Sequence, residues 1–98
     1  MAKIYDIEEI KRISIPIAQK YGVKKLALFG SYARGEQKET SDIDFLIDKG
    51  RIRGWAYFGF IQDLEDDFGI NVDVLTYDTL KRSLIADAIE DEVVLYEE

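Results

Sequence analysis

The chain has 98 residues, 47% of them hydrophobic and 34% charged, which predicts one small globular domain over residues 1–98 and excludes a disordered chain. It contains no cysteine and no histidine, so any acid–base or metal chemistry must use carboxylates, lysine, tyrosine or serine. A net charge of −7 argues against direct binding of nucleic acid. The sequence shows no signal peptide and no apolar run of about 20 residues, which predicts a cytoplasmic protein with no membrane partner.

The N-terminal segment has the pattern of an amphipathic helix. Asp6 and Glu9 stand at capping-box spacing, and isoleucines recur behind them every three or four residues. We expect a helix over 6–21 that Pro16 kinks or splits, because proline removes a backbone donor and clashes with the preceding turn. Gly22 is the candidate residue for ending this helix in the left-handed conformation.

Short apolar stretches bounded by glycine or polar residues predict the strands. These stretches are Lys24–Phe29, Asp42–Ile47, Ile70–Leu75 and, at an edge, Val93–Tyr96. A short helix is expected over Ser31–Arg34, followed by a polar loop over Gly35–Ser41, and a last helix begins at Asp78 or Thr79. Helices and strands alternate along the chain, so we expect a mixed α/β domain in which helices cover one sheet.

A longer helix is predicted over 55–68, with Gly69 beyond its end. Its expected buried stripe is Trp55, Phe58, Ile61, Leu64 and Phe68. The aromatic residues at its start have two interpretations. They pack between helix and sheet, or they form a patch for partner docking or base stacking, helped by Arg51 and Arg53.

Acidic residues in two predicted strands carry the first sign of function. Side chains two residues apart on a strand point to the same face, so Asp42 and Asp44 project together, about 7 Å apart at Cα. Asp73 stands among apolar neighbours in another strand, and paired strands lie about 5 Å apart. Three carboxylates held in this way could bind two Mg²⁺ ions about 4 Å apart. Each acid alone has a plainer explanation, since Asp42 follows a turn-like serine and Asp73 could simply face solvent.

Gly30 and Ser31 predict a phosphate site at the end of the first strand. A glycine at this position lets a phosphate approach the backbone, and the backbone N–H groups at a helix start attract anions. Ser31 offers a hydroxyl to a phosphate oxygen, and Arg34 adds positive charge. The plain alternative is that Ser31 is only the N-cap of the following helix.

Taken together, these motifs resemble the DNA polymerase β-like nucleotidyltransferase superfamily, and more closely the minimal nucleotidyltransferase (MNT) proteins of bacteria and archaea. The matching stretches are Gly30–Glu36, Ser41–Ile47 and Val72–Leu75, with a similar lead-in at Pro16–Val23 and a similar ending at Val94–Glu97. The resemblance therefore covers nearly the whole chain. It implies an α+β fold with a polymerase-β-like core, in which helices cover a small mixed sheet.

The resemblance also implies roles for the residues that match the motifs. A nucleoside triphosphate, ATP in the expected case, binds at Gly30 and Ser31. Asp42 and Asp44 coordinate two magnesium ions. Asp73 coordinates one of these ions and is placed to help deprotonate the attacking hydroxyl.

For the biological role, the resemblance implies an MntA-like antitoxin paired with a HEPN-type toxin. Such an antitoxin transfers AMP from ATP to a hydroxyl of the toxin, in the expected case a tyrosine. The alternative is a non-catalytic antitoxin that masks a partner ribonuclease by direct binding. A third possibility, modification of a small molecule, usually requires an acceptor-binding domain for which 98 residues leave no room.

Overall fold

The structure, a computed structural model, describes residues 4–77 and 92–98. Its elements in chain order are α1 (Ile7–Tyr21), β1 (Lys25–Phe29), α2 (Gly30–Arg34), β2 (Ile43–Asp48), α3 (Trp55–Phe68), β3 (Val72–Thr76) and β4 (Val93–Glu97). All four predicted strands are confirmed, and the helix expected from Asp78 or Thr79 lies outside the described residues. Within the described ranges, no helix combines the length and apolar character needed to cross a membrane.

Helix α1 begins and ends as its sequence predicts. The Asp6 side chain accepts a hydrogen bond from the Glu9 backbone N–H, and the Glu9 side chain accepts one from the Asp6 backbone N–H, which completes the capping box. Gly22 ends the helix at φ 77°, and its N–H donates to the carbonyls of Ala18 and Gln19.

Of the two expected outcomes, a kink or a split at Pro16, the split does not occur, because the helix runs through the proline. An interior proline costs about 3 kcal/mol in an isolated helix. Here Ile10 and Ile17, on either side of the proline, are buried, and α1 packs against α3. This packing holds the helix together across the proline.

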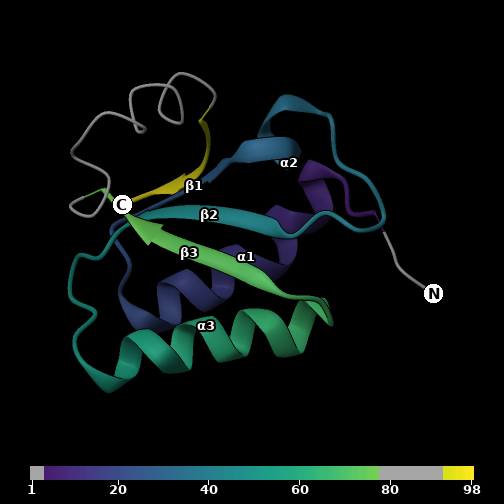
Figure 1. Cartoon of the computed structure of the whole chain (residues 1–98). Helices are drawn as coiled ribbons and strands as arrows, with labels where there is room; N and C mark the ends of the chain where they lie inside the picture. The colour runs from purple at the N-terminus through teal and green to yellow at the C-terminus, as the bar shows by residue number, and fades with distance from the viewer. Residues whose placement is uncertain (1–3, 78–91) are drawn as a thin grey trace.

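The four strands form one mixed sheet in the order β3-β2-β1-β4. Strand β1 pairs antiparallel with both β2 and β4, whereas β2 pairs parallel with β3. Parallel neighbours need a crossover connection, and α3 supplies it between β2 and β3. Helices α1 and α3 lie together on one face of the sheet, and the short α2 stands at the end of β1 (Figure 1). The expected small mixed sheet covered by helices is thereby confirmed.

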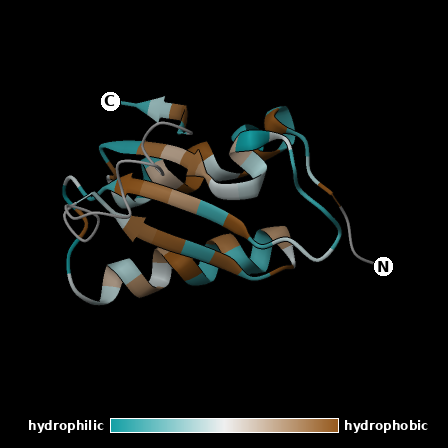
Figure 2. Ribbon diagram, turned by 45° about the horizontal axis from the view of Figure 1, so that its top comes forward, coloured by the Kyte–Doolittle hydropathy of each residue, from teal (hydrophilic) through white to brown (hydrophobic). Residues whose placement is uncertain are grey.

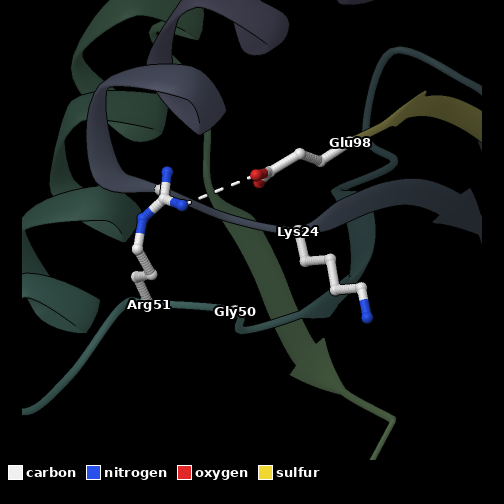
Figure 3. Close-up of a pocket in the computed structure, with 5 residues that line it drawn as sticks. Lys24, Gly50, Arg51 and Glu98 are labelled. Carbon is white, nitrogen blue, oxygen red and sulfur yellow. Dashed lines mark hydrogen bonds and ion pairs between the residues drawn. The ribbon is translucent and has the colours of Figure 1, made fainter.

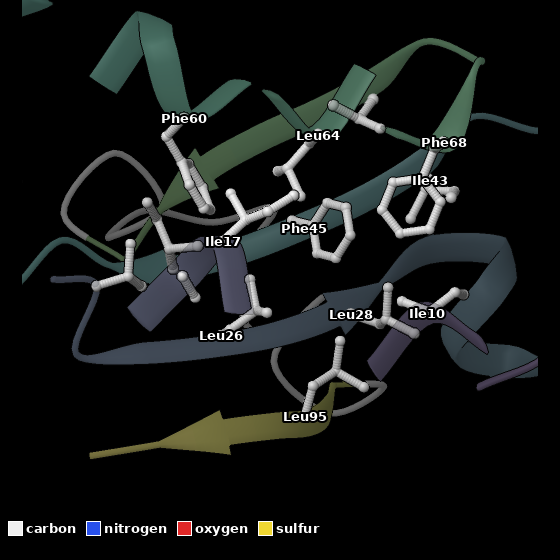
Figure 4. Packing of buried hydrophobic residues seen from close by; sticks show 14 of the residues in the cluster. Ile10, Ile17, Leu26, Leu28, Ile43, Phe45, Phe60, Leu64, Phe68 and Leu95 are labelled. Atoms are coloured by element: carbon white, nitrogen blue, oxygen red, sulfur yellow. The ribbon is translucent and has the colours of Figure 1, made fainter. Parts of the chain in front are cut away.

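The main core lies between the sheet and the α1–α3 layer (Figure 4). Along β2, Ile43, Phe45 and Ile47 are fully buried in this cluster, and Leu26 and Leu28 join them from β1. Because side chains alternate along a strand, the residues between them point to the opposite face. This alternation leaves the face away from α1 and α3 for the acidic side chains.

The predicted buried stripe of α3 is confirmed for Leu64 and Phe68 and is wrong for the first turn. Trp55 is 88% exposed and Phe58 is 64% exposed, and Phe60 is buried instead. Two apolar stripes, offset by about half a turn, are compatible with the sequence, because a helix repeats every 3.6 residues. The sheet and α1 select the stripe that contains Phe60. Its ring makes an edge contact with Tyr21 at 5.8 Å between centroids.

A matched pair of substitutions tests this orientation of α3. We expect Phe60→Ala to lower the free energy of unfolding by roughly 3–5 kcal/mol, because it opens a cavity in the core. Phe58→Ala removes an exposed ring and should change it by less than about 0.5 kcal/mol. Urea denaturation at low protein concentration measures both values, and equal losses would contradict the orientation described here.

Candidate functional site

Asp44 and Asp73 meet on the sheet face opposite α1 and α3. They are register partners in the parallel pair β2–β3, and Asp73 lies close enough to Asp44 to raise its pKa. Figure 2 shows two neighbouring strands as hydrophobic ribbons, each interrupted by a hydrophilic band. Asp44 is half-buried, while Asp73 is exposed. Two acids on adjacent strands thus converge as their sequence patterns predict.

The environment of Asp44 favours its protonated form. Burial, the hydrogen bond with Asp73, and the negative charges of Asp73 and Asp42 raise the pKa of Asp44 to about 6, against a small opposing effect of Arg34. A carboxyl group with a raised pKa beside a second carboxyl is typical of functional sites. Asp44 and Asp73 repel each other when both are ionised, and a bound cation would offset this repulsion.

Asp42 stands at the entrance to β2 and is exposed. The turn before it is held by Ser41, whose Oγ accepts a hydrogen bond from the Lys38 backbone N–H and whose own N–H donates to the Lys38 carbonyl, both at 2.9 Å. Asp42 lies near enough to Asp44 to affect its pKa. Residues 4–77 and 92–98 nevertheless contain no group of three acidic, histidine or cysteine side chains close enough to hold one ion.

The residues present fit Mg²⁺ that arrives with a nucleotide. Mg²⁺ keeps part of its water and is usually bound by one or two carboxylates together with substrate phosphates. The Asp44–Asp73 pair offers two carboxylates, and Asp42 adds a third charge at the same end of β2. This donor set contains only oxygen ligands, which is the chemistry that Mg²⁺ prefers.

The Gly30 turn packs directly against Asp44. Gly30 has φ +71°, and a Cβ placed on it would lie 2.4 Å from Oδ2 of Asp44. Any other residue would be strained by this backbone conformation, and its Cβ would displace the turn or the Asp44 carboxylate. The predicted phosphate turn and the predicted metal ligands are therefore in contact.

Ser31 lies inside α2 and is not its N-cap. The N-cap is Phe29, which provides no side-chain hydrogen bond to the first turn. The plain alternative for Ser31 is therefore wrong. At the other end, Gly35 closes α2 at φ 71° with its N–H directed to the carbonyls of Ser31 and Tyr32. The buried Tyr32 anchors this turn, since its hydroxyl accepts a hydrogen bond from the Tyr5 backbone N–H at 3.4 Å.

Arg34 lies at the last turn of α2, and its charge reaches Asp44. Its Nε donates to Oε1 of Glu36 at 2.6 Å, and both side chains are partly exposed. Glu36 was not among the predicted site residues. The signal that could have found it is an acid two residues after an arginine at a helix end, which is weak.

The six predicted residues thus lie around the ends of β1, β2 and β3 that meet at α2. A family model of the nucleotidyltransferase domain matches residues 10–96, a range that contains all of them. The chain belongs to the nucleotidyltransferase family.

Named relatives agree with this assignment. The nucleotidyltransferase is 48% identical over 92 residues to MJ0435 of Methanocaldococcus jannaschii, which is named provisionally as a protein adenylyltransferase; the match covers 91% of this chain and 96% of that protein. It is 38% identical over 93 residues to the protein adenylyltransferase MntA of Thermococcus cleftensis, with 90% and 93% covered. The domain match and these names support a nucleotidyltransferase enzyme, as expected from the motifs.

A solved structure shares the fold of this nucleotidyltransferase. A chain from the complex of a tri-AMPylated Shewanella oneidensis HEPN toxin with an MNT antitoxin superposes with a TM-score of 0.66 at 16% identity. The match covers 94% of the nucleotidyltransferase and 73% of that chain. The two chains therefore share a fold.

Proposed function

We propose that this chain is a magnesium-dependent protein adenylyltransferase that transfers AMP from ATP to a tyrosine hydroxyl of a partner HEPN toxin and thereby acts as its antitoxin. The observation that carries the proposal is the contact between the Gly30 turn and the Asp44–Asp73 pair. This contact brings a backbone suited to phosphate beside carboxylates suited to Mg²⁺. The names of the relatives and the toxin complex support the same activity and partner.

In this proposal the carboxylates bind metal and handle the proton. Asp42 and Asp44 would hold the two Mg²⁺ ions, and Asp73 would add a third carboxylate to the same site. The ions supply positive charge for the triphosphate and for the transition state. The exposed Asp73 accepts the proton of the tyrosine hydroxyl. The hydroxyl oxygen forms a bond to the α-phosphorus of ATP, and the bond from that phosphorus to the β-phosphate oxygen breaks, so pyrophosphate leaves.

The turn residues bind and orient the nucleotide. The Gly30 backbone and the Ser31 hydroxyl contact the phosphate oxygens. The Arg34 guanidinium releases the Glu36 carboxylate and binds a phosphate oxygen in its place. Asp42 and Asp73 are both exposed, so a second protein chain can reach the reacting atoms. We place the whole activity in one minimal nucleotidyltransferase domain over residues 1–98.

Transfer of label from ATP tests the proposal. The wild-type chain is mixed with purified HEPN toxin from the same genome, Mg²⁺ and ATP labelled in the α-phosphate, and we expect label on the toxin. Asp42→Asn and Asp73→Asn should each reduce labelling by about 100-fold or more. Asp67→Asn is the matched control, because Asp67 is an exposed acid on α3, which covers the sheet face opposite the Asp44–Asp73 pair.

The same experiment distinguishes the non-catalytic alternative. The toxin's nuclease activity is measured after incubation with each variant, with and without ATP. If neutralisation requires ATP and fails with Asp42→Asn, transfer is the mechanism. If Asp42→Asn and Asp73→Asn neutralise the toxin fully without label, the chain acts by masking and the proposal is wrong.

A further inference from the structure

The first turn of α3 exposes two large aromatic side chains. Trp55 is 88% exposed and Phe58 is 64% exposed, and their ring centroids lie 6.2 Å apart. The other exposed large hydrophobic residues in the described part of the chain are the aliphatic Ile4 and Val94. Adjacent exposed aromatic side chains are typical of protein contact surfaces, where aromatic residues are enriched. We call Trp55 and Phe58 the aromatic pair.

The charges along α3 and the loop before it are strongly asymmetric. The loop carries Lys49, Arg51 and Arg53, and residues 49–58 contain no acid, although the chain has a net charge of −7. Arg51 turns to Glu98 at 3.5 Å beside the pocket of about 280 Å³ in Figure 3. Lys49 and Arg53 have no acidic partner among the described residues. We call Lys49, Arg51 and Arg53 the basic loop.

The second half of α3 is acidic. Asp63, Asp66 and Asp67 lie there, and Asp66 and Asp67 are exposed. Asp66 follows Trp55 by eleven residues, about three turns, so the two share the outward side of the helix. The outer surface of α3 is therefore aromatic and flanked by cations at one end and acidic at the other.

We infer that two copies of this chain associate through α3, antiparallel and across a two-fold axis near the aromatic pair. This arrangement packs Trp55 of each copy against Phe58 of the other. It also directs each basic loop toward the acidic second half of the other copy's helix. A two-fold interface uses the same patch twice, so it needs a self-complementary surface, which the outer side of α3 provides.

The charge pattern favours a second copy over an unrelated protein. An acidic partner would match the basic loop but meet repulsion from Asp66 and Asp67. A basic partner would match those acids but not the basic loop. A matching surface must place acidic residues opposite the basic loop and basic residues opposite Asp66 and Asp67. The α3 region of a second copy, running in the opposite direction, has this arrangement. An aromatic centre with a charged rim is also the common anatomy of protein interfaces.

The proposed contact leaves the nucleotidyltransferase site open. Helix α3 runs antiparallel to β3, so its first turn lies at the end of the sheet away from Asp44 and Asp73 (Figure 1). The fourteen residues of α3 span about 21 Å. A dimer formed at the first turn therefore carries two accessible sites. The inference does not depend on which acceptor those sites modify.

Sedimentation and fluorescence test the dimer on the full chain. Analytical ultracentrifugation over a wide concentration range should show a reversible monomer–dimer equilibrium. Trp55 is the single tryptophan, so its emission should shift to shorter wavelength as concentration rises and the ring leaves water. Trp55→Ala and Phe58→Ala should each weaken association by roughly tenfold or more. Val94→Ala, which trims an exposed side chain on β4, is the control expected to leave it unchanged.

Charge exchange tests the antiparallel orientation. Arg53→Glu and Asp66→Lys should each weaken the dimer, and the double variant should recover part of the affinity, because the two ends that approach each other again carry opposite charge. Circular dichroism verifies that each exposed-site variant is folded. A wild-type chain that stays monomeric at all concentrations would overturn the inference, even if Trp55→Ala weakened binding to a toxin. A dimer that is indifferent to the aromatic pair would overturn it as well.

Discussion

Asp44→Asn should raise the melting temperature of the metal-free protein and at the same time abolish nucleotidyl transfer. The half-buried Asp44 carboxylate lies beside Asp73 and near Asp42, and this repulsion and burial raise its pKa to about 6. Asparagine has the same shape without the charge. The expected gain is on the order of 1–2 kcal/mol at neutral pH, allowing for solvent screening of a partly exposed group. That corresponds to roughly 4–8 °C for each kcal/mol in a domain of this size.

The pH dependence of this gain has a definite sign. Because the pKa of Asp44 is raised on folding, the folded protein holds a proton that the unfolded chain releases. Wild-type stability from this group is therefore present at low pH and lost as pH rises from the ordinary value of 3.8 through about 6. Asp44→Asn has no such loss. The difference in melting temperature between Asp44→Asn and the wild type should therefore increase with pH across this range and stay constant above it.

In the presence of Mg²⁺ and nucleotide, the melting temperature of the wild type should exceed that of Asp44→Asn. Ligands that bind only the folded state stabilise it by mass action. The wild-type melting temperature should therefore rise when Mg²⁺ and a non-hydrolysable ATP analogue are added, while that of Asp44→Asn should not. Asp48→Asn, at the exposed far end of the same strand, is the control for both effects. A metal-free Asp44→Asn protein that is less stable than wild type would contradict the carboxylate repulsion.

Gly30→Ala should destabilise the protein and remove its activity together. Alanine is strained at φ +71°, and its Cβ would lie 2.4 Å from Oδ2 of Asp44, so the turn or the carboxylate must shift. We expect a loss of about 1–3 kcal/mol in the free energy of unfolding. A displacement of about 1 Å at reacting groups is enough to reduce transfer by roughly 100-fold. Chemical denaturation and the labelling assay measure the two effects.

Gly69→Ala is the matched control for this variant. Gly69 has the same φ of 71°, but nothing lies within 4 Å of the position its Cβ would take. It therefore carries the backbone strain without the collision, and it lies beyond α3, outside the proposed site. We expect Gly69→Ala to lose about 1 kcal/mol or somewhat more and to keep full activity. Equal stability losses with intact activity in both variants would show that the contact between Gly30 and Asp44 has no functional role.

Much of the proposed site follows from local rules that the folded chain obeys. A strand alternates strictly, so Asp42 and Asp44 had to share a face with the residue between them in the core. An acid between Val72 and Val74 had to point away from that core once its strand paired beside β2. What these rules could not supply was the register that places Asp44 directly opposite Asp73. A shift of one residue would have turned Asp73 into the α1–α3 layer.

Helices α1 and α3 show where local patterns fail. In α1 a proline that normally interrupts a helix is tolerated, because buried residues on both sides hold the two turns in place. In α3 the aromatic residues admit two stripes, and spacing cannot choose between them. The choice depended on contacts with Tyr21 and the sheet, which come from distant parts of the chain.

The amino-acid order was sufficient to indicate the chemistry, the family resemblance and the extent of most elements, because capping, strand alternation and turn geometry act over a few neighbouring residues. Three further features emerged from the assembled fold alone: the alignment of Asp44 with Asp73 across the β2–β3 pair, the close approach of Gly30 to Asp44, and the exposure of Trp55 and Phe58. Each depends on how separate segments pack against one another. Packing is set by the whole set of contacts, and no short stretch of sequence contains that information.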